Sequence, residues 1–300
     1  MRRSVAGLAC AGFAPLIRIG HAAGEINVTT LADDLWLLTG GGGNVLARST
    51  ADGQVIVDSG AAEFSTDLIA TLGELPGERI AGLFNTHWHP EQVGANDAIG
   101  QTGAAIFAHD KTRQRLAAGY YLRDEDRYEP PVPAAGIPTE TIFDQGQVRF
   151  GATDVDYGYL IEAHTDGDAY IRFPDIDVIA VGDVLAPDRD PVFDWFGGGW
   201  LGGRLDSIKL LLESSDARTR FVPAYGPVVG RAEVVAEQAL YLELFDLFVE
   251  HIRLGQSARD MIDLGLHEGL SREFSDPFRL FYDLHKGFWA HENKLMHDIV

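Results

Sequence analysis

The sequence is poor in cysteine and in basic residues, and each shortage excludes a class of protein. Cys10 is the only cysteine among 300 residues, so the chain can form neither an internal disulfide nor a metal site built from several thiolates. Lys and Arg number 24 against 45 Asp and Glu, which gives a formal charge of −21 at pH 7. A chain this acidic lacks the cationic surface that neutralises phosphates, which argues against nucleic acid and anionic membranes as partners.

The chain also lacks a long apolar run. About 20 consecutive apolar residues are needed to cross a bilayer, and the most apolar stretch, residues 4–17, ends before Arg18. No membrane span is therefore expected. What the sequence does contain is core material, with 16 Phe, 9 Tyr and 5 Trp in a chain that is 46% hydrophobic, a composition typical of a folded globular protein.

Residues 1–23 have the pattern of a secretory signal peptide. A basic start with Arg2 and Arg3 precedes the apolar stretch, and Gly20-His21-Ala22-Ala23 offers a cleavage site of mostly small residues. The pattern predicts a periplasmic or secreted protein, and the Arg2-Arg3 pair leaves the twin-arginine export route open. The alternative is that these residues form an N-terminal helix.

No linker rich in Pro, Gly or Ser divides the remaining chain, so we expect one domain over residues 24–230 with a helical extension at 231–300 packed on it. Apolar strands separated by turns are predicted at 35–38, 44–47, 54–58, 80–85, 104–108, 148–150, 157–162, 169–173 and 177–181, and helices at 63–72, 205–213 and 232–253. Two groups of strands, each finished by helices, predict an α/β fold with two mixed sheets packed face to face.

Two further segments allow a structural interpretation. The run Gly40 to Gly43 continues into the apolar Asn44-Val45-Leu46 rather than into the Lys-Ser/Thr and helix of a phosphate loop, so it predicts a hairpin turn. The tail after Ser257 carries aromatic residues at helical spacing. This spacing favours core packing or a homodimer contact through the C-terminal helices over a cofactor site.

The sequence contains one group of residues suited to bind a metal ion. His87 and His89 follow the predicted strand at 80–85 and can point to the same side of the loop. A pair of this kind is weak evidence alone, but His164 and Asp183 each follow another predicted strand. Imidazole and carboxylate donors in this number suit Zn²⁺.

Five motifs occur in the order found in the metallo-β-lactamase superfamily, and the chain resembles that family from about Leu31 to Gly230. They are Val57-Asp58-Ser59-Gly60, Thr86-His87-Trp88-His89, Ala163-His164-Thr165-Asp166-Gly167-Asp168, Gly182-Asp183 and Pro223-Ala224-Tyr225-Gly226-Pro227. The resemblance implies an αββα sandwich of four layers with the metal site at one edge. It also implies that His87, His89 and His164 bind a first metal ion and that Asp183 is the bridging aspartate.

The residues that would bind a second metal ion in the family are altered. Glu91 stands where the family has Asp, Gln92 where it has His, and Tyr225 where it has the last His. A neutral amide is a poor metal donor, and a phenol with a pKa near 10 must first lose its proton. We therefore expect one metal ion per chain, with Asp58 as an acceptor that supports the histidine loop.

The predicted function is hydrolysis of an ester, lactone, thioester or amide by a hydroxide bound to zinc at the His₃ site. In this hypothesis Glu91 is the general base or proton shuttle, Asp183 orients the water or completes the coordination, and Tyr225 stabilises the developing oxyanion. Two alternatives remain open. The altered second site is also consistent with a catalytically impaired protein that binds a metal or a ligand, and iron in the His₃ site would give redox chemistry.

The segment 191–200 follows Asp183 closely, so Trp195, Phe196 and Trp200 are candidates for an apolar wall around a small-molecule substrate, with packing of the loop as the alternative. The charged segment 120–128 is either a solvated loop or a lid. The acidity of the chain favours a neutral or cationic substrate.

Overall fold

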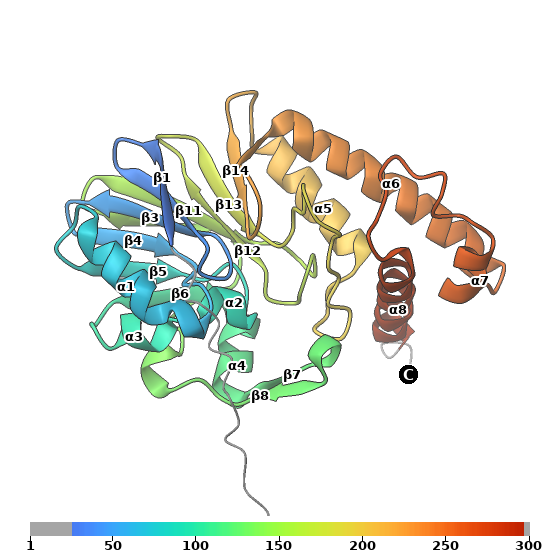
Figure 1. Cartoon of the computed structure of the whole chain (residues 1–300), viewed down its shortest axis with the longest axis horizontal. Helices are drawn as coiled ribbons and strands as arrows, with labels where there is room; N and C mark the ends of the chain where they lie inside the picture. Colours follow the sequence, from blue (N-terminus) through green and yellow to red (C-terminus); the bar gives the residue numbers. More distant parts are fainter. Residues whose placement is uncertain (1–25, 297–300) are drawn as a thin grey trace, which may run out of the picture.

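Two β-sheets packed face to face form the centre of the computed structural model, which describes residues 26–296 (Figure 1). The first sheet has seven strands in the order β1 (Asn27–Ala32), β2 (Leu35–Thr39), β3 (Val45–Thr50), β4 (Gly53–Val57), β5 (Ile80–Phe84), β6 (Ala105–His109) and β9 (Glu140–Ile142). The second has six strands in the order β10 (Gly146–Phe150), β11 (Thr153–Tyr159), β12 (Ala169–Phe173), β13 (Val178–Gly182), β14 (Arg220–Pro223) and β15 (Val229–Gly230).

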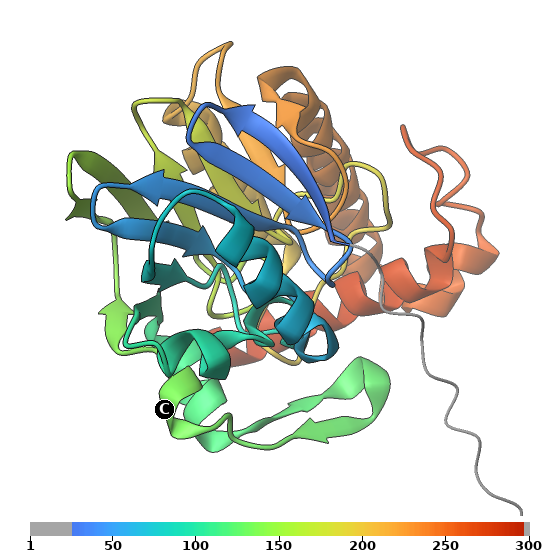
Figure 2. The same ribbon diagram turned by 60° about the vertical axis from the view of Figure 1, so that its left-hand side comes forward.

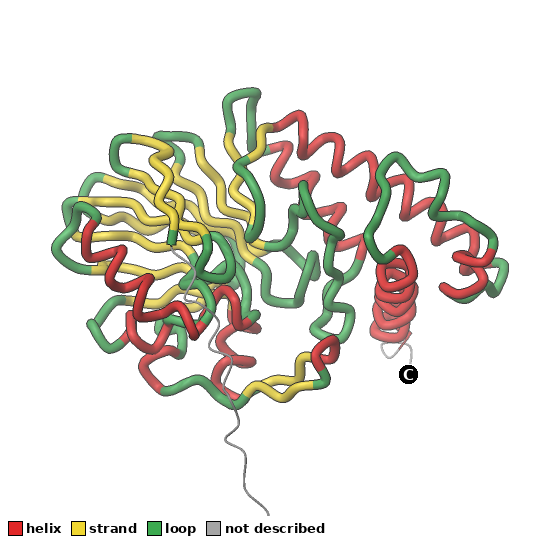
Figure 3. Tube along the Cα trace, viewed as in Figure 1, coloured by secondary structure: helices red, strands yellow, loops and turns green. Residues whose placement is uncertain are grey.

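Helices cover the outer face of each sheet (Figure 3). The first sheet is covered by α1 (Ser65–Glu74), α2 (Pro90–Val93), α3 (Asn96–Gly100) and α4 (Asp110–Ala118), with short 3₁₀ helices at Ala62–Phe64, Arg123–Glu125 and Ala134–Gly136. The second is covered by α5 (Leu201–Glu213) and α6 (Arg231–Arg253), and α8 (Pro277–Met296) packs against these two helices and against α7 (Ala258–Asp263). The four layers confirm the predicted sandwich.

Buried apolar side chains pack between the layers and stabilise the sandwich. Between the sheets, Val55 and Phe84 of the first sheet pack with Ile171 and Val178 of the second, and all four are buried. On the outer face of the second sheet, one cluster joins Ile179 of β13 to side chains of α5, α6 and α8. The C-terminal helices therefore share the core of the second sheet.

The strand directions determine where the functional residues lie. Strand β5 runs parallel to β4 and β6, and β13 runs parallel to β14. The carboxyl ends of parallel strands meet at one edge of a sheet, where ligands bind in many α/β folds. The loops after β4, β5, β13 and β14 carry Asp58, His87, Asp183 and Tyr225, so the topology gathers these segments.

Most of the predicted elements are present, but several elements were not predicted, among them β1, α4, β14 and a hairpin after α4. The run Gly40–Gly43 is the predicted turn between β2 and β3, with Gly42 at a φ of 96°. The segment after α4, expected to be a loop or lid, contains a hairpin formed by β7 (Tyr120–Leu122) and β8 (Arg127–Glu129). The predicted signal peptide, residues 1–23, lies outside the described residues. Among residues 26–296, no helix combines the length and apolar character that crossing a membrane requires.

Candidate metal centre

Four side chains that follow three different strands meet at one edge of the sandwich. His87 and His89 lie after β5, His164 lies between β11 and β12, and Asp183 follows β13. Their ligand atoms all lie within 4.8 Å of one another. The three imidazole rings pack edge to face with centroids 4.8 to 4.9 Å apart, and Nε2 of His87 lies 3.7 Å from Oδ2 of Asp183. The structure thus brings together all four predicted metal ligands.

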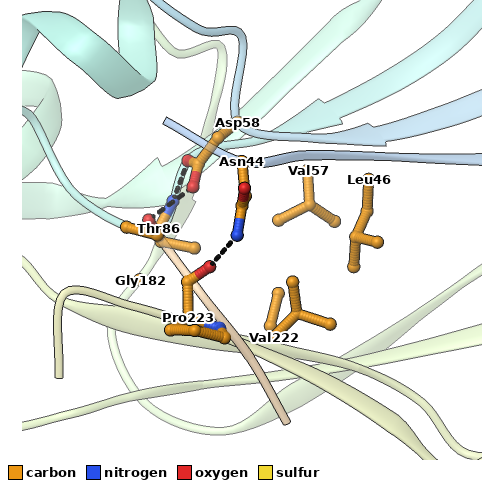
Figure 4. Close-up of a pocket in the computed structure, with 10 residues that line it drawn as sticks. Asn44, Leu46, Val57, Asp58, Thr86, Gly182, Val222 and Pro223 are labelled. Atoms are coloured by element: carbon orange, nitrogen blue, oxygen red, sulfur yellow. Dashed lines mark hydrogen bonds between the residues drawn. The ribbon is translucent and has the colours of Figure 1, made fainter. Parts of the chain in front are cut away.

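Asp58 determines the orientation of His87 through Thr86. The Thr86 backbone N–H donates to Oδ1 of Asp58 and the Thr86 hydroxyl donates to Oδ2, both at 2.7 Å (Figure 4). Because that hydroxyl donates its only hydrogen to Asp58, it accepts a hydrogen bond from Nδ1 of His87 at 3.1 Å. Nε2 of His87 is left with a free lone pair toward Asp183. Glycine at position 182 lets β13 lie close to Thr86, since a Cβ there would lie 2.8 Å from the Thr86 hydroxyl oxygen.

A small closed cavity lies behind these residues, between the ends of the two sheets (Figure 4). Its volume is about 10 Å³, close to the minimum for one water molecule. Asn44 closes one side by donating to the carbonyl oxygens of Pro223 and Gly226 at 2.9 and 3.0 Å. The cavity is too small for a substrate, whereas the metal cluster is partly exposed at His89, near the partly exposed Glu91.

Two aspartates hold the other histidines. Nε2 of His89 lies 3.1 Å from Oδ2 of Asp194, and a donor at Nε2 leaves Nδ1 of His89 for a metal ion. Asp168 accepts from the backbone N–H groups of His164 and Thr165 at 2.6 Å each, which fixes the loop that carries His164. Sequence reasoning missed Asp194, although it lies inside the segment 191–200 that was expected near the metal ion.

Burial and neighbouring charges give the three histidines different pKa values. Burial lowers the pKa of His87 and of His164 well below the ordinary value, and the neighbouring His89 lowers both further. Burial would also lower the pKa of His89, but the hydrogen bond and charge of Asp194 outweigh it, with help from Asp183, so that pKa is raised. His87 and His164 are therefore neutral at pH 7, which is the form that binds metal ions.

Unpartnered donor atoms show that the cluster fits a metal ion. Nε2 of His87 and both ring nitrogens of His164 are buried without a hydrogen-bond partner among the described residues. A buried polar atom without a hydrogen-bond partner destabilises the folded state by roughly 1–3 kcal/mol. A metal ion bound to these nitrogens would offset that loss. Three imidazoles and one carboxylate match the donor number and type of a tetrahedral zinc site.

The altered second-metal residues lie beside the cluster without belonging to it. Glu91 and Gln92 are in α2, directly after His89, and Tyr225 follows β14. Gln92 is fully buried, and neither its amide oxygen nor its amide nitrogen has a strong hydrogen bond in residues 26–296. Burial raises the pKa of Tyr225, and the charges of Asp183 and Glu91 raise it further. Its phenol therefore keeps its proton and offers a donor rather than a metal ligand.

Two arginines near the cluster were not predicted. Arg189 stacks on the ring of Tyr225, with its Cζ 4.1 Å from the ring centroid, and its charge acts on His87 and Asp183. Arg204 in α5 is fully buried and its Cζ lies 4.0 Å from the ring centroid of Phe193. The acidic chain thus has positive charge close to its metal ligands, which no local sequence pattern indicated.

The three predicted wall residues lie in different surroundings. Trp195 follows Asp194, and the Cζ of Arg123 lies 4.8 Å from its ring centroid. Phe196 is 53% exposed and packs edge to face with Trp195. Trp200 instead stacks on His291 at a centroid distance of 3.7 Å and contacts Phe288 of α8. The structure therefore places Trp195 and Phe196 together and directs Trp200 toward the C-terminal helices.

The stability of the metal-free protein should fall between pH 6.5 and 8. Burial raises the pKa of Asp58 from 3.8 to about 8 and that of Asp168 to about 7. A carboxyl with a raised folded-state pKa stabilises the folded state below its unfolded pKa, and this contribution is lost as pH rises through the folded pKa. The lowered pKa values of His87 and His164 change the stability only below about pH 6.5. We expect a loss of up to about 1.4 kcal/mol per pH unit from each carboxyl.

Urea unfolding at several pH values measures this dependence. Asp58→Asn should flatten the slope, and Asn tolerates the φ of 59° at this position. The zinc-loaded protein should show a weaker loss or a gain, because metal binding competes with protons on the ligands. Equal slopes for the wild type and Asp58→Asn would contradict the assignment of this titration to Asp58.

Comparison with known proteins agrees with this architecture. A family model described as the metallo-beta-lactamase superfamily matches residues 38–225. No curated protein matches the chain in a sequence search. Among solved structures, a metallo-beta-lactamase from Pontibacter korlensis is 17% identical, with 72% of this chain and 99% of that chain covered and a TM-score of 0.58. The DIM-1 metallo-beta-lactamase is 16% identical, with 72% and 97% covered and a TM-score of 0.58.

A third solved structure covers more of the chain. The inverting sec-alkylsulfatase Pisa1 from Pseudomonas sp. is 13% identical, with a TM-score of 0.65 over 89% of this chain and 50% of that chain. The chain thus spans about half the length of Pisa1. At these identities the likeness shows a shared fold.

Proposed function

This chain belongs to the metallo-β-lactamase superfamily, and on that premise we propose that it is a hydrolase that uses a single zinc ion to cleave an ester, lactone, thioester or amide. The observation that carries the proposal is the cluster of His87, His89, His164 and Asp183, whose ligand atoms lie within 4.8 Å and in which Nε2 of His87 and both nitrogens of His164 are buried without a hydrogen-bond partner within residues 26–296. The basic and apolar pattern of residues 1–23 supports export of the enzyme to the periplasm or the medium.

When bound, a zinc ion supplies Lewis acidity that favours ionisation of water near neutral pH and polarises a carbonyl group. Glu91 is the general base of the proposed reaction. It lies two residues after His89 and its charge acts on His89, Asp183 and Tyr225. From this position its carboxylate takes the proton that the attacking water loses and returns it to the leaving group.

Tyr225 and Asp183 have complementary roles in the proposal. The protonated phenol of Tyr225 donates a hydrogen bond to the negative charge that develops on the substrate oxygen. Asp183 orients the attacking water or completes the coordination of the metal ion. Gln92 and Tyr225, both neutral, take the place of two second-metal ligands, which supports a centre with one metal ion rather than two.

Glu91→Gln tests the proposed base. The amide keeps the size of the side chain but cannot accept a proton, so we expect kcat to fall by about 10²-fold while zinc content stays at one per chain. The assay is hydrolysis of nitrophenyl esters, lactones and lactams by zinc-loaded protein, with a chelated sample as the blank. Glu74→Gln, at an exposed glutamate of α1, is the matched control and should leave kcat unchanged.

The same assay separates the remaining alternatives. Full turnover by Glu91→Gln would show that Glu91 is not the base. One zinc per chain without hydrolysis of any substrate would favour a protein that binds a metal or ligand without catalysis. Iron in the protein as isolated would favour redox chemistry at the His₃ site.

Sulfate ester hydrolysis is a second candidate, favoured by Arg189. The overall charge of the chain opposes an anionic substrate, but the guanidinium of Arg189 lies beside Tyr225 and close enough to act on His87 and Asp183. The likeness of the fold to a sec-alkylsulfatase is consistent with this candidate. A nitrophenyl sulfate in the substrate panel tests it, and Arg189→Gln should weaken turnover of the sulfate more than that of a neutral ester.

A further inference from the structure

The β7–β8 hairpin is attached to the metal-binding loop at its base. Tyr120, the first residue of β7, packs against Trp88 with ring centroids 4.7 Å apart, and Trp88 packs against His89 at 4.4 Å. Trp88 is fully buried and belongs to one apolar cluster with Leu122 of the hairpin and Leu116 of α4. The turned view in Figure 2 shows the hairpin as an arm that projects from the end of α4.

The far end of the hairpin is fastened to two other segments by Arg123. Its Nη2 donates to the hydroxyl of Tyr282 in α8 at 3.0 Å. Its Cζ lies 5.1 Å from the ring centroid of Tyr282 and 4.8 Å from that of Trp195. A two-stranded hairpin alone is only marginally stable in water, so these contacts of Arg123 help to hold the tip in place. Arg123 therefore joins the hairpin, the loop 191–200 and the C-terminal extension.

The same three segments present aromatic side chains to solvent. Phe196 is 53% exposed and Tyr121 is 39% exposed, and the two rings meet edge to face with centroids 6.0 Å apart. These two rings, with Trp195, Arg123 and Tyr282, are called the aromatic rim below. The rim is connected to the metal centre through the chain, because its Trp195 directly follows Asp194, which is hydrogen-bonded to His89. Neighbouring exposed rings of this kind commonly mark a binding surface.

We propose that the aromatic rim determines substrate specificity by receiving an aromatic or branched aliphatic group of the substrate, while Arg123 holds the rim together. This inference rests on the proposed function, since the bond to be cleaved must lie at the metal centre. Aromatic side chains offer a large contact area with few rotatable bonds, so they bind an apolar group at low entropic cost. The rim includes Tyr282 of α8, which gives the C-terminal extension a role in selecting the substrate.

The test compares two thiols that bind zinc through sulfur and differ only in their apolar part. Phenylmethanethiol carries a ring for the rim and ethanethiol does not. By calorimetry on the zinc-loaded protein, we expect phenylmethanethiol to bind about tenfold more tightly than ethanethiol, the gain that partial burial of a ring gives. Phe196→Ala and Arg123→Gln should each reduce this ratio to about threefold or less, with the affinity for ethanethiol unchanged.

Arg127→Gln is the matched control, because Arg127 is in the same hairpin and pairs with Glu125 and Glu129 there. It should keep the tenfold ratio. Hydrogen exchange of residues 120–129 should be faster in Arg123→Gln than in the wild type or Arg127→Gln, which reports release of the hairpin tip. An unchanged thiol ratio in both Phe196→Ala and Arg123→Gln would overturn the inference. Failure of the wild type to bind zinc, measured before any thiol is added, would instead contradict the proposed function.

Discussion

His164→Ala is expected to lower the zinc content from about one per chain to less than a tenth and to reduce hydrolysis to the uncatalysed rate. Among the described residues, His164 contributes the only ligand of the cluster from the β11–β12 loop, it is 1% exposed, and its nitrogens have no hydrogen-bond partner. The remaining donors are His87, His89 and Asp183. Without His164 the set of three imidazoles is broken and only two imidazoles and a carboxylate remain, so the zinc ion loses affinity and the His₃ arrangement on which the proposed activation of water depends. Metal analysis after dialysis and the ester assay measure the two effects.

A second measurement separates loss of metal from loss of fold. A ligand that binds only the folded state stabilises it by RT ln(1 + [L]/Kd), about 4 kcal/mol at a thousandfold excess over Kd. Wild-type protein should therefore gain thermal stability on addition of zinc, and His164→Ala should not. The matched control is His285→Ala, at a histidine of α8 outside the cluster, which should keep both the zinc and the thermal shift. Binding of one zinc at wild-type affinity by His164→Ala would rule out the His₃ centre.

The metal ligands could be predicted from sequence because each directly follows a strand. His87, His89 and Asp183 come one to five residues after an apolar run, and such runs can be recognised locally. Parallel strand order then gathers the ends of these runs at one edge. The Gly182-Asp183 pair also has a local explanation. Gly182 has a φ of 57°, which favours glycine, and it lies against Thr86, where a side chain would not fit.

The residues that support the ligands could not be predicted in this way. Asp194 reaches His89 across 105 positions of sequence, and Arg189 reaches Tyr225 across a loop and a helix. Neither contact leaves a periodic or local signal. The β7–β8 hairpin was missed because its strands are only three residues each and because the turn between them and β8 itself are charged, whereas strand prediction relies on longer runs of apolar alternation. Its position depends on Trp88 and Tyr282, which only the tertiary structure brings to it.

The burial of Arg204 also depends on tertiary structure, and replacing this residue is expected to have the largest effect on stability. The position looks exposed in sequence, yet Arg204 is fully buried. Its Nη2 donates to the carbonyl oxygen of Val192 at 2.5 Å and its Nη1 donates to the Tyr241 hydroxyl at 3.4 Å. That hydroxyl donates to the buried carboxylate of Glu237 at 2.5 Å, which also accepts from the backbone N–H of Ala186 at 2.8 Å. Arg204 is thus linked through Tyr241 to the carboxylate of Glu237.

Arg204→Met should therefore lower the free energy of unfolding by about 3–5 kcal/mol, because it removes a buried cation whose charge acts on Asp168 and Asp183 and which is linked through Tyr241 to the buried carboxylate of Glu237. Urea unfolding of the zinc-loaded protein gives the value. Replacing both partners, as Arg204→Met with Glu237→Met, should recover much of the loss, since apolar side chains of similar volume often substitute for a buried ion pair. Lys209→Ala, at an exposed lysine of the same helix, should change stability by less than about 0.5 kcal/mol. If the double variant were no more stable than Arg204→Met, packing around Arg204 rather than charge compensation would account for the loss.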